Sequence, residues 1–325
     1  MPIPERLAID PRFAPLAVTV SLFVAMVVAG SALYEGFFAP QVFLNLLIDN
    51  AFLCIVAVGM TFVILTGGID LSVGAVVALT TMISAQLVER NGVSPWLVFP
   101  LVLAIGALFG MAQGYLIQRF SLQPFIVTLA GMFLARGLCY IISTESISIA
   151  NPVYSAIAQA RIPLGGHASL SVGAIIALLV VLAGMWIAHR TQFGRTVYAI
   201  GGSESSARLM GLPVDATVVR VYMLSGFCAA LGGVAVTFYM QSGYSLHAVG
   251  LELDAIAAVV IGGTLLRGGV GYVAGTLFGV LILGIIQTLI TFEGTLSSWW
   301  TRIAVGALLF AFCLLQRLFE ARRRA

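Results

Sequence analysis

LSVGAIIALLVVLAGMWIA, residues 170–188, is an unbroken apolar run, and the polar stretch HRTQFGRTVYAIGGSESSARLMGLP, residues 189–213, follows it directly. A helix of about 20 mainly apolar residues is long enough to cross the hydrocarbon core of a bilayer. The whole chain has a similar character, since 60% of its residues are hydrophobic, 9% are charged and the mean hydropathy is +1.07. These values indicate an integral membrane protein that leaves the bilayer over residues 189–213.

Ten apolar blocks predict an all-α, polytopic membrane protein with about ten transmembrane helices. The blocks cover residues 13–34, 51–66, 71–88, 96–117, 125–142, 170–188, 218–240, 255–266, 270–290 and 299–315. The second and eighth blocks are short, so we expect short or broken helices near Gly67-Gly68 and Gly262-Gly263.

The basic residues set the expected orientation, and all sixteen of them are arginine. With an inside amino terminus and ten crossings, only Arg90 and Arg161 fall clearly outside, which satisfies the positive-inside rule. The cytoplasmic arginines are then Arg6, Arg12, Arg119, Arg190, Arg195, Arg208, Arg220, Arg267, Arg317, Arg322, Arg323 and Arg324. We expect both termini in the cytoplasm. The expected domains are a tail at 1–12, one transmembrane domain at 13–317 with a cytoplasmic coupling loop at 189–217, and a basic tail at 318–325.

Cysteine and histidine give no sign of metal chemistry. The four cysteines lie in four different apolar blocks without a CxxC pair, which favours burial as small packing residues. His167 and His247 fall outside and His189 falls inside, with no helical HxxxH spacing. We therefore expect no metal site.

Glycines recur at every fourth residue in two of the blocks. They are Gly106, Gly110 and Gly114 in the fourth block, and Gly271, Gly275 and Gly279 in the ninth. A four-residue step places each set on one helix face, where two backbones can approach closely. Tight packing within one subunit is the simpler interpretation, and packing against a second subunit is the alternative.

Two similar interruptions break apolar runs with paired glycines: TGGIDLSVG, residues 66–74, and IGGTLLRGGVG, residues 261–271. Non-helical backbone at membrane depth is tolerated only where it is buried in protein or lines a watery cavity. The interruptions are therefore candidates for gate or path-lining elements. The residues concerned are Thr66, Gly67, Gly68, Asp70, Gly262 and Gly263. Ordinary turns are the alternative, in which Asp70 caps the next helix.

Other polar side chains lie within or beside the apolar blocks. Gln241 and Gln287 are further candidates for the transport path. Arg136 lies inside a block, where it either snorkels to the outer interface or faces the path. Glu252 and Asp254, at the expected outer start of the eighth block, are either helix-terminus acids or a docking point for a basic extracytoplasmic partner.

The chain contains no lysine, and this bears on its energy source. A phosphate-binding P-loop needs the lysine of GxxxxGK[ST], so this chain cannot carry that motif. If transport is driven by ATP, then ATP and Mg²⁺ are bound by a partner ATPase and not by this chain.

The polar stretch is the expected contact for such a partner. Ser203 can cap a short helix with Glu204 in its first turn, and Gly211 and Pro213 end it. The candidate coupling residues are Arg195, Ser203, Glu204, Ser205, Ser206, Ala207, Arg208, Leu209, Met210 and Gly211. A solvated connector between two transmembrane segments is the alternative.

Three long phrases carry a family resemblance. VGMTFVILTGGIDLSVGA (58–75), FGRTVYAIGGSESSARLMGL (193–212) and LDAIAAVVIGGTLLRGGVG (253–271) closely resemble the ribose-type permeases of bacterial ABC sugar importers. Within that family, TESISIANPVYSAI (144–157) and TFEGTLSSWWTRIA (291–304) are most similar to one permease of the galactofuranose importer.

The resemblance implies a multi-pass subunit of the bacterial inner membrane that imports galactofuranose or a ribose- or galactose-like sugar. Its implied partners are a second permease subunit, homologous or identical, an ATP-binding cassette subunit, a periplasmic sugar-binding protein and membrane lipid. No nucleic acid partner and no catalytic residue are expected. Force from the cassettes would reach the membrane helices through the segment from Ser203 to Gly211, by different contacts in two states.

The residues also bear on two other classes of function, a secondary transporter and an intramembrane enzyme. A secondary transporter would use an intramembrane carboxylate or cation site driven by an ion gradient, and acids are scarce inside the apolar blocks. An intramembrane enzyme would need a clustered nucleophile and base or paired metal-binding acids, which the scattered histidines and loop acids do not supply.

Overall fold

The computed structural model describes residues 14–165, 168–295, 297 and 299–324. The predicted tail at 1–12 and His167 lie outside these residues. Most of the described residues, about 76%, are helical, as predicted. The helices are α1 (Ala14–Leu33), α2 (Pro40–Asp49), α3 (Ala51–Leu65), α4 (Val73–Ala85), the π-helix η2 (Gln86–Arg90), α5 (Pro95–Arg119), α6 (Pro124–Ile142), α7 (Pro152–Gln159), α8 (Val172–Arg190), α9 (Gln192–Gly202), α10 (Glu204–Leu209), α11 (Val214–Met240), α12 (Leu251–Ile261), α13 (Val273–Glu293) and α14 (Trp299–Arg324).

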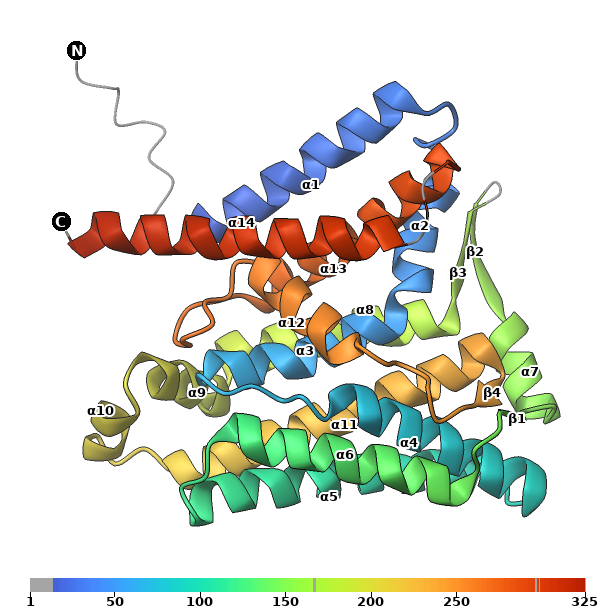
Figure 1. Cartoon of the computed structure of the whole chain (residues 1–325), viewed down its shortest axis with the longest axis horizontal. Coiled ribbons are helices and arrows are strands. Elements are labelled where there is room, and N and C mark those ends of the chain that lie inside the picture. The colour runs from blue at the N-terminus through green and yellow to red at the C-terminus, as the bar shows by residue number, and fades with distance from the viewer. Residues whose placement is uncertain (1–13, 166–167, 296, 298, 325) are drawn as a thin grey trace.

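Figure 1 shows a bundle whose long helices run roughly parallel or antiparallel between two ends. One end, called the α10 end, carries α9, α10 and the loops at 66–72 and 262–272. The other, called the strand end, carries α7 and the strands. The helix α1 begins, and α14 ends, on the α10 side of the picture. The predicted tail at 318–325 is helical as far as Arg324, because α14 continues through it.

Seven of the described helices are long and apolar enough to cross a membrane: α1, α4 continued by η2, α5, α6, α8, α11 and α13. The helices α2 and α3, bent by 58°, make an eighth span if they count as one. The helix α12 has 11 residues, and the apolar part of α14, Trp299–Leu314, is also short of a full span. The chain is a multi-pass membrane protein, whereas ten crossings and cytoplasmic termini stay predictions.

The glycine stripes pack within the chain. A Cβ added at Gly110 would lie 2.0 Å from the Tyr222 carbonyl oxygen, and one at Gly226 would lie 2.1 Å from the Gly106 oxygen, so α5 and α11 touch backbone to backbone. A Cβ at Gly279 would likewise lie 1.9 Å from the Ala258 oxygen of α12. The described contacts favour the intrasubunit interpretation. Buried Cys54, Cys139 and Cys228 and half-buried Cys313 agree with packing roles.

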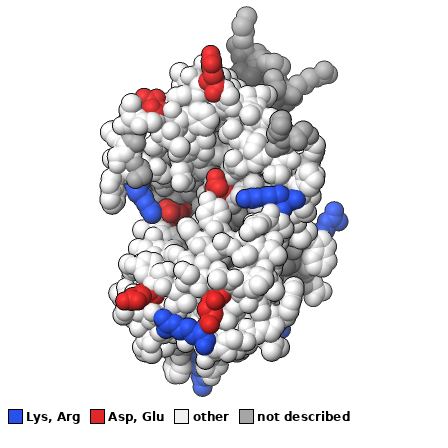
Figure 2. Space-filling model, turned by 90° about the vertical axis from the view of Figure 1, so that its right-hand side faces the viewer, with Lys and Arg blue, Asp and Glu red and all other residues white. Residues whose placement is uncertain are grey.

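The described residues also form two small antiparallel sheets at the strand end, which the predicted all-α class did not include. In one, β1 (Ile147–Ser148) pairs with β4 (Ser242–Gly243); in the other, β2 (Arg161–Gly165) pairs with β3 (Ala168–Ser171). The expected outer loop after α6 is therefore structured. Figure 2 looks onto this end and shows isolated acidic and basic side chains on a mostly uncharged surface.

An irregular stretch of chain with turns precedes each of the two helices α4 and α12. The segment at 66–72 runs from the α10 end into the bundle before α4 begins, and residues 244–250 run from the strand end before α12 begins (Figure 1). The two helix beginnings meet, because a Cβ at Gly74 would lie 2.3 Å from Glu252 Oε2 and 2.7 Å from the Ala248 oxygen. Glu252 lies in the first turn of α12, which agrees with the prediction of a helix-terminus acid, but this turn packs inside the bundle against the start of α4.

Candidate coupling and gate site

The polar stretch after α8 folds into two helices. The predicted one is α10, in which Ser203 Oγ accepts a hydrogen bond from the Ser206 N–H at 3.3 Å and Gly211 follows with φ of 75°. The helix α9 was missed. The sequence did contain a signal for α9, because Thr191 is a preferred N-cap residue and apolar residues follow it at helical spacing. In the structure, Thr191 Oγ1 accepts a hydrogen bond from the Gly194 N–H at 3.1 Å.

Arg208 ties α10 to the bundle. Its Nη2 donates to Asp215 Oδ1 of α11 at 2.6 Å, to Glu204 Oε1 at 2.9 Å and to Gln118 Oε1 of α5 at 3.3 Å. The hydrogen bonds that Arg208 donates to Asp215 and then to Glu204 raise its pKa. Exposed ion pairs contribute at most about 1 kcal/mol each, so Arg208 orients α10 more than it stabilises the fold.

The outer face of α10 is open. Leu209 is 89% exposed and Met210 is 67% exposed, while Ala207 is buried beneath them. Arg195 of α9 and the side chains of Ser205 and Ser206 are also exposed. Solvent-exposed apolar side chains on a short, capped helix are the kind of anchor that fits a pocket on a partner protein.

The helix α9 locks directly onto both glycine interruptions. The Gly269 N–H donates to the Leu65 carbonyl oxygen at 2.9 Å, which joins the two interruptions to each other. Gly201 at the end of α9 fits over this bond, because a Cβ there would lie 1.8 Å from the Leu65 oxygen and 2.3 Å from the Gly269 nitrogen. Tyr198 Oη also donates to the Gly271 oxygen at 2.8 Å. The end of α9 therefore contacts both interruptions at backbone distance.

The first interruption is held in the bundle through Asp70. Its Oδ1 accepts from the Ser72 N–H at 2.9 Å and its Oδ2 from Ser225 Oγ of α11 at 2.7 Å. Ser72 and not Asp70 is the N-cap of α4, which corrects that alternative. Ser225 lies 11 residues after the start of α11, or about 16 Å along it. Asp70 is only 1% exposed, so a carboxylate does lie deep in the bundle.

We expect Asp70→Ala to lower the free energy of unfolding by about 1–3 kcal/mol, because the buried Ser72 N–H and Ser225 hydroxyl lose their acceptor. Thermal unfolding in detergent measures the change. Asp215→Ala is the control, since Asp215 is also a bonded aspartate but its side chain is 65% exposed. Equal melting temperatures for the two variants would contradict the anchoring role of Asp70.

The other path candidates lie in several places. Thr66 Oγ1 donates to the Val63 oxygen at 2.7 Å, and Gly67 and Gly68 lie against Arg267 and Tyr222. Gly262 packs on Gly275, and neighbouring Gly263 is also buried. Gln241 lies far away at the strand end. Gln287 is exposed on α13, so the structure does not bring it to the others.

Arg136 points inward. Its Nη1 donates to the carbonyl oxygens of Ser245 at 2.5 Å and His247 at 2.9 Å, so it supports the turns at 244–250 and does not snorkel outward. Asp254 Oδ1 accepts from Arg302 Nη1 of α14 at 3.0 Å. Because Glu252 is inside and Asp254 is paired with Arg302, this pair does not offer two free acids to an extracytoplasmic partner.

Several comparisons with known proteins bear on this arrangement. The family model "Branched-chain amino acid transport system / permease component" matches residues 42–313. The inner membrane ABC transporter permease protein YjfF of Escherichia coli (strain K12) is 53% identical over 306 residues, which cover 94% of this chain and 92% of that protein. The fructose import permease protein FruG of Bifidobacterium longum is 44% identical, covering 96% and 93%. The ribose import permease protein RbsC of Bacillus subtilis is 38% identical, covering 96% of both chains. No solved structure matches the chain.

The described residues form a polytopic helical bundle in which the capped helix α9 packs on two glycine interruptions. The chain belongs to the branched-chain amino acid transport system / permease component family, among the ribose-type ABC permeases. It is a multi-pass protein of the inner membrane. Its part in transport is that of a permease and not of an enzyme.

Proposed function

We propose that this chain is the membrane-spanning subunit of an ATP-driven importer of a monosaccharide, either galactofuranose or a ribose-, fructose- or galactose-like sugar. Its partners are a second permease subunit, a separate cassette that binds ATP and Mg²⁺, and a periplasmic sugar-binding protein. The permeases of fructose and ribose import named above support the substrate class.

The contact of α9 with both interruptions carries the proposal. The cassette would bind the exposed Leu209 and Met210 side chains at the α10 end. Its closure would move α10 and α9 together, since Ala207 is buried against the bundle and Ser203 joins the two helices. Gly201 would pass this movement to the hydrogen bond between Leu65 and Gly269. The two interruptions would then shift and open or close the sugar path.

The test is uptake by the complete importer, reconstituted in proteoliposomes with ATP inside. We expect ATP-dependent uptake of at least one labelled sugar among ribose, fructose, galactose and galactofuranose. Uptake that needs no ATPase and follows an ion gradient would contradict the proposal and favour the secondary transporter, in which buried Asp70 would be the first candidate for the ion site.

Leu209→Asp is expected to weaken binding of the cassette, because a charge replaces an apolar side chain at the contact. ATP-driven uptake is expected to fall by about 5- to 150-fold, the change in affinity that typical coupling free energies produce. Folding is expected to be unchanged, since Leu209 is 89% exposed. Pull-down of the cassette by the detergent-purified variant measures the contact directly. Leu246→Asp is the control, because Leu246 is also exposed but lies beyond α11 at the strand end. Normal cassette binding by the Leu209 variant would refute the docking face.

A further inference from the structure

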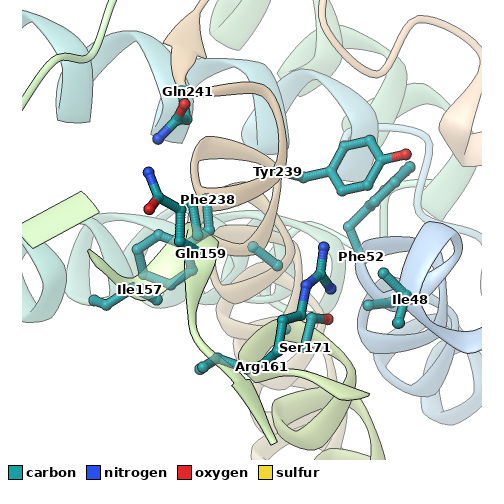
Figure 3. Close-up of a pocket in the computed structure, with 14 residues that line it drawn as sticks. Ile48, Phe52, Ile157, Gln159, Arg161, Ser171, Phe238, Tyr239 and Gln241 are labelled. Atoms are coloured by element: carbon teal, nitrogen blue, oxygen red, sulfur yellow. The ribbon is translucent and has the colours of Figure 1, made fainter. Parts of the chain in front are cut away.

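A cavity of about 270 Å³ lies at the strand end, remote from the coupling helices (Figure 3). Four parts of the chain form it: the bend between α2 and α3, the end of α7 with the start of β2, the start of α8, and the end of α11. Its floor is apolar, with buried Ile48, Ala235 and Phe238. No role in coupling accounts for a cavity at this end of the bundle.

The polar groups of the cavity come from separate elements and converge. Figure 3 shows the amide ends of Gln159 and Gln241 directed toward one another, with Arg161 rising beside Ser171 and Tyr239. Arg161 is the one charged residue among those that line the cavity. These groups supply amide, guanidinium and hydroxyl donors together with amide acceptors.

Aromatic rings border the same space. Phe52 and Tyr239 lie on one side of it and Phe238 on another (Figure 3). Tyr239 is fixed in place, because its Oη donates to Asp49 Oδ1 at 3.2 Å, next to the bend between α2 and α3. Aromatic faces among a few convergent polar groups are typical of small-molecule sites.

Gln241 ends α11 in a left-handed backbone conformation. Gln241 has φ of 48° and ψ of 40°, a left-handed conformation that costs free energy for a residue with a Cβ. Its carbonyl accepts from the Ile149 N–H at 2.8 Å and its Nε2 lies 3.4 Å from Ser155 Oγ. The strand pairing thus fixes the backbone of Gln241 at the cavity wall, in the left-handed conformation with which helices commonly end.

We propose that this cavity is a subsite that binds one monosaccharide on the permease itself, before the sugar enters the bundle. The proposal rests on the proposed function for the direction of transport and for the class of sugar. Hydroxyls of the sugar would bond Gln159, Arg161 and Gln241, and an apolar face of the ring would lie on Phe52 or Phe238. The volume is just below the roughly 300 Å³ at which ligand pockets begin, which restricts the occupant to a single ring.

Direct binding to the purified full chain in detergent tests the subsite without any partner. Saturation-transfer difference NMR with ribose, fructose, galactose and galactofuranose is expected to show transfer to at least one of them, and Gln241→Ala and Arg161→Ala are expected to weaken it about tenfold each. Gln123→Ala is the control, since Gln123 is exposed before α6, makes no side-chain cap hydrogen bond and lies outside the cavity. Absence of transfer for all four sugars, or equal transfer in the cavity variants and the wild type, would overturn the subsite.

Uptake by the reconstituted importer gives the second measurement. The cavity variants are expected to raise the KM for sugar about tenfold while ATP hydrolysis without sugar stays unchanged. If the wild type binds sugar but shows no ATP-driven uptake, the proposed function fails while the cavity remains a sugar site. If inorganic phosphate displaces the sugar from the wild type and binds more tightly, Arg161 defines an anion site and the subsite is refuted.

Discussion

Gly201→Ala is expected to abolish or severely reduce ATP-driven uptake while leaving the chain folded in the membrane. The added Cβ would lie 1.8 Å from the Leu65 oxygen and 2.3 Å from the Gly269 nitrogen, whereas non-bonded heavy atoms prefer about 3.5 Å. Both neighbours are backbone atoms, which cannot rotate away as a side chain would. The end of α9 must therefore withdraw from the two interruptions, and the hydrogen bond between Leu65 and Gly269 is expected to break.

Gly202→Ala is a matched control, because Gly202 is the next residue of α9 and a Cβ there meets nothing within 4 Å. Sugar uptake and ATP hydrolysis are measured for both variants in the reconstituted importer. We expect the Gly201 variant to hydrolyse ATP without importing sugar, with uptake at least about tenfold below that of the Gly202 variant. Equal uptake by the two variants would show that α9 does not transmit force to the interruptions.

Gly110→Val is expected to give the largest loss of stability. The carbonyl oxygen of Tyr222 occupies the position that a Cβ would need, at 2.0 Å, so α5 and α11 must separate along their crossing. Overpacking typically costs about 1–3 kcal/mol, and a backbone contact places this site at the upper limit. Each kcal/mol corresponds to roughly 2–4 °C in chains of about 150–250 residues and to less in a longer chain, so a decrease of about 5 °C in melting temperature is expected.

Gly137→Val separates this effect from helix propensity. Gly137 lies within α6, and a Cβ there meets nothing within 4 Å. Thermal unfolding of both variants in the same detergent is the measurement. Were the two variants to melt together, the close approach of α5 and α11 would have no energetic weight, and the glycine stripe would need another explanation.

The local signals were sufficient for α10. Ser203, Glu204 and Gly211 are cap and stop residues whose preferences act over one or two turns, so a single sequence predicts the helix they bound. The apolar blocks were equally informative about which segments are helical. The sequence was less informative for the depth of Glu252, because helix periodicity does not reveal how far the turns at 244–250 enter the bundle before α12 starts.

The sequence by itself determined that this chain is a multi-pass helical membrane protein whose 325 residues contain no P-loop, because apolar length and the absence of lysine can be read without knowing the fold. The permease class followed from the resemblance of three long phrases to a known family. Only the tertiary structure decided that α9 closes over both glycine interruptions, that Arg136 and Glu252 face inward, and that Gln159, Arg161 and Gln241 share one cavity. These contacts join residues tens to hundreds of positions apart. The contacts arise from the close approach of backbones and from burial. No short-range sequence pattern predicts backbone approach or burial.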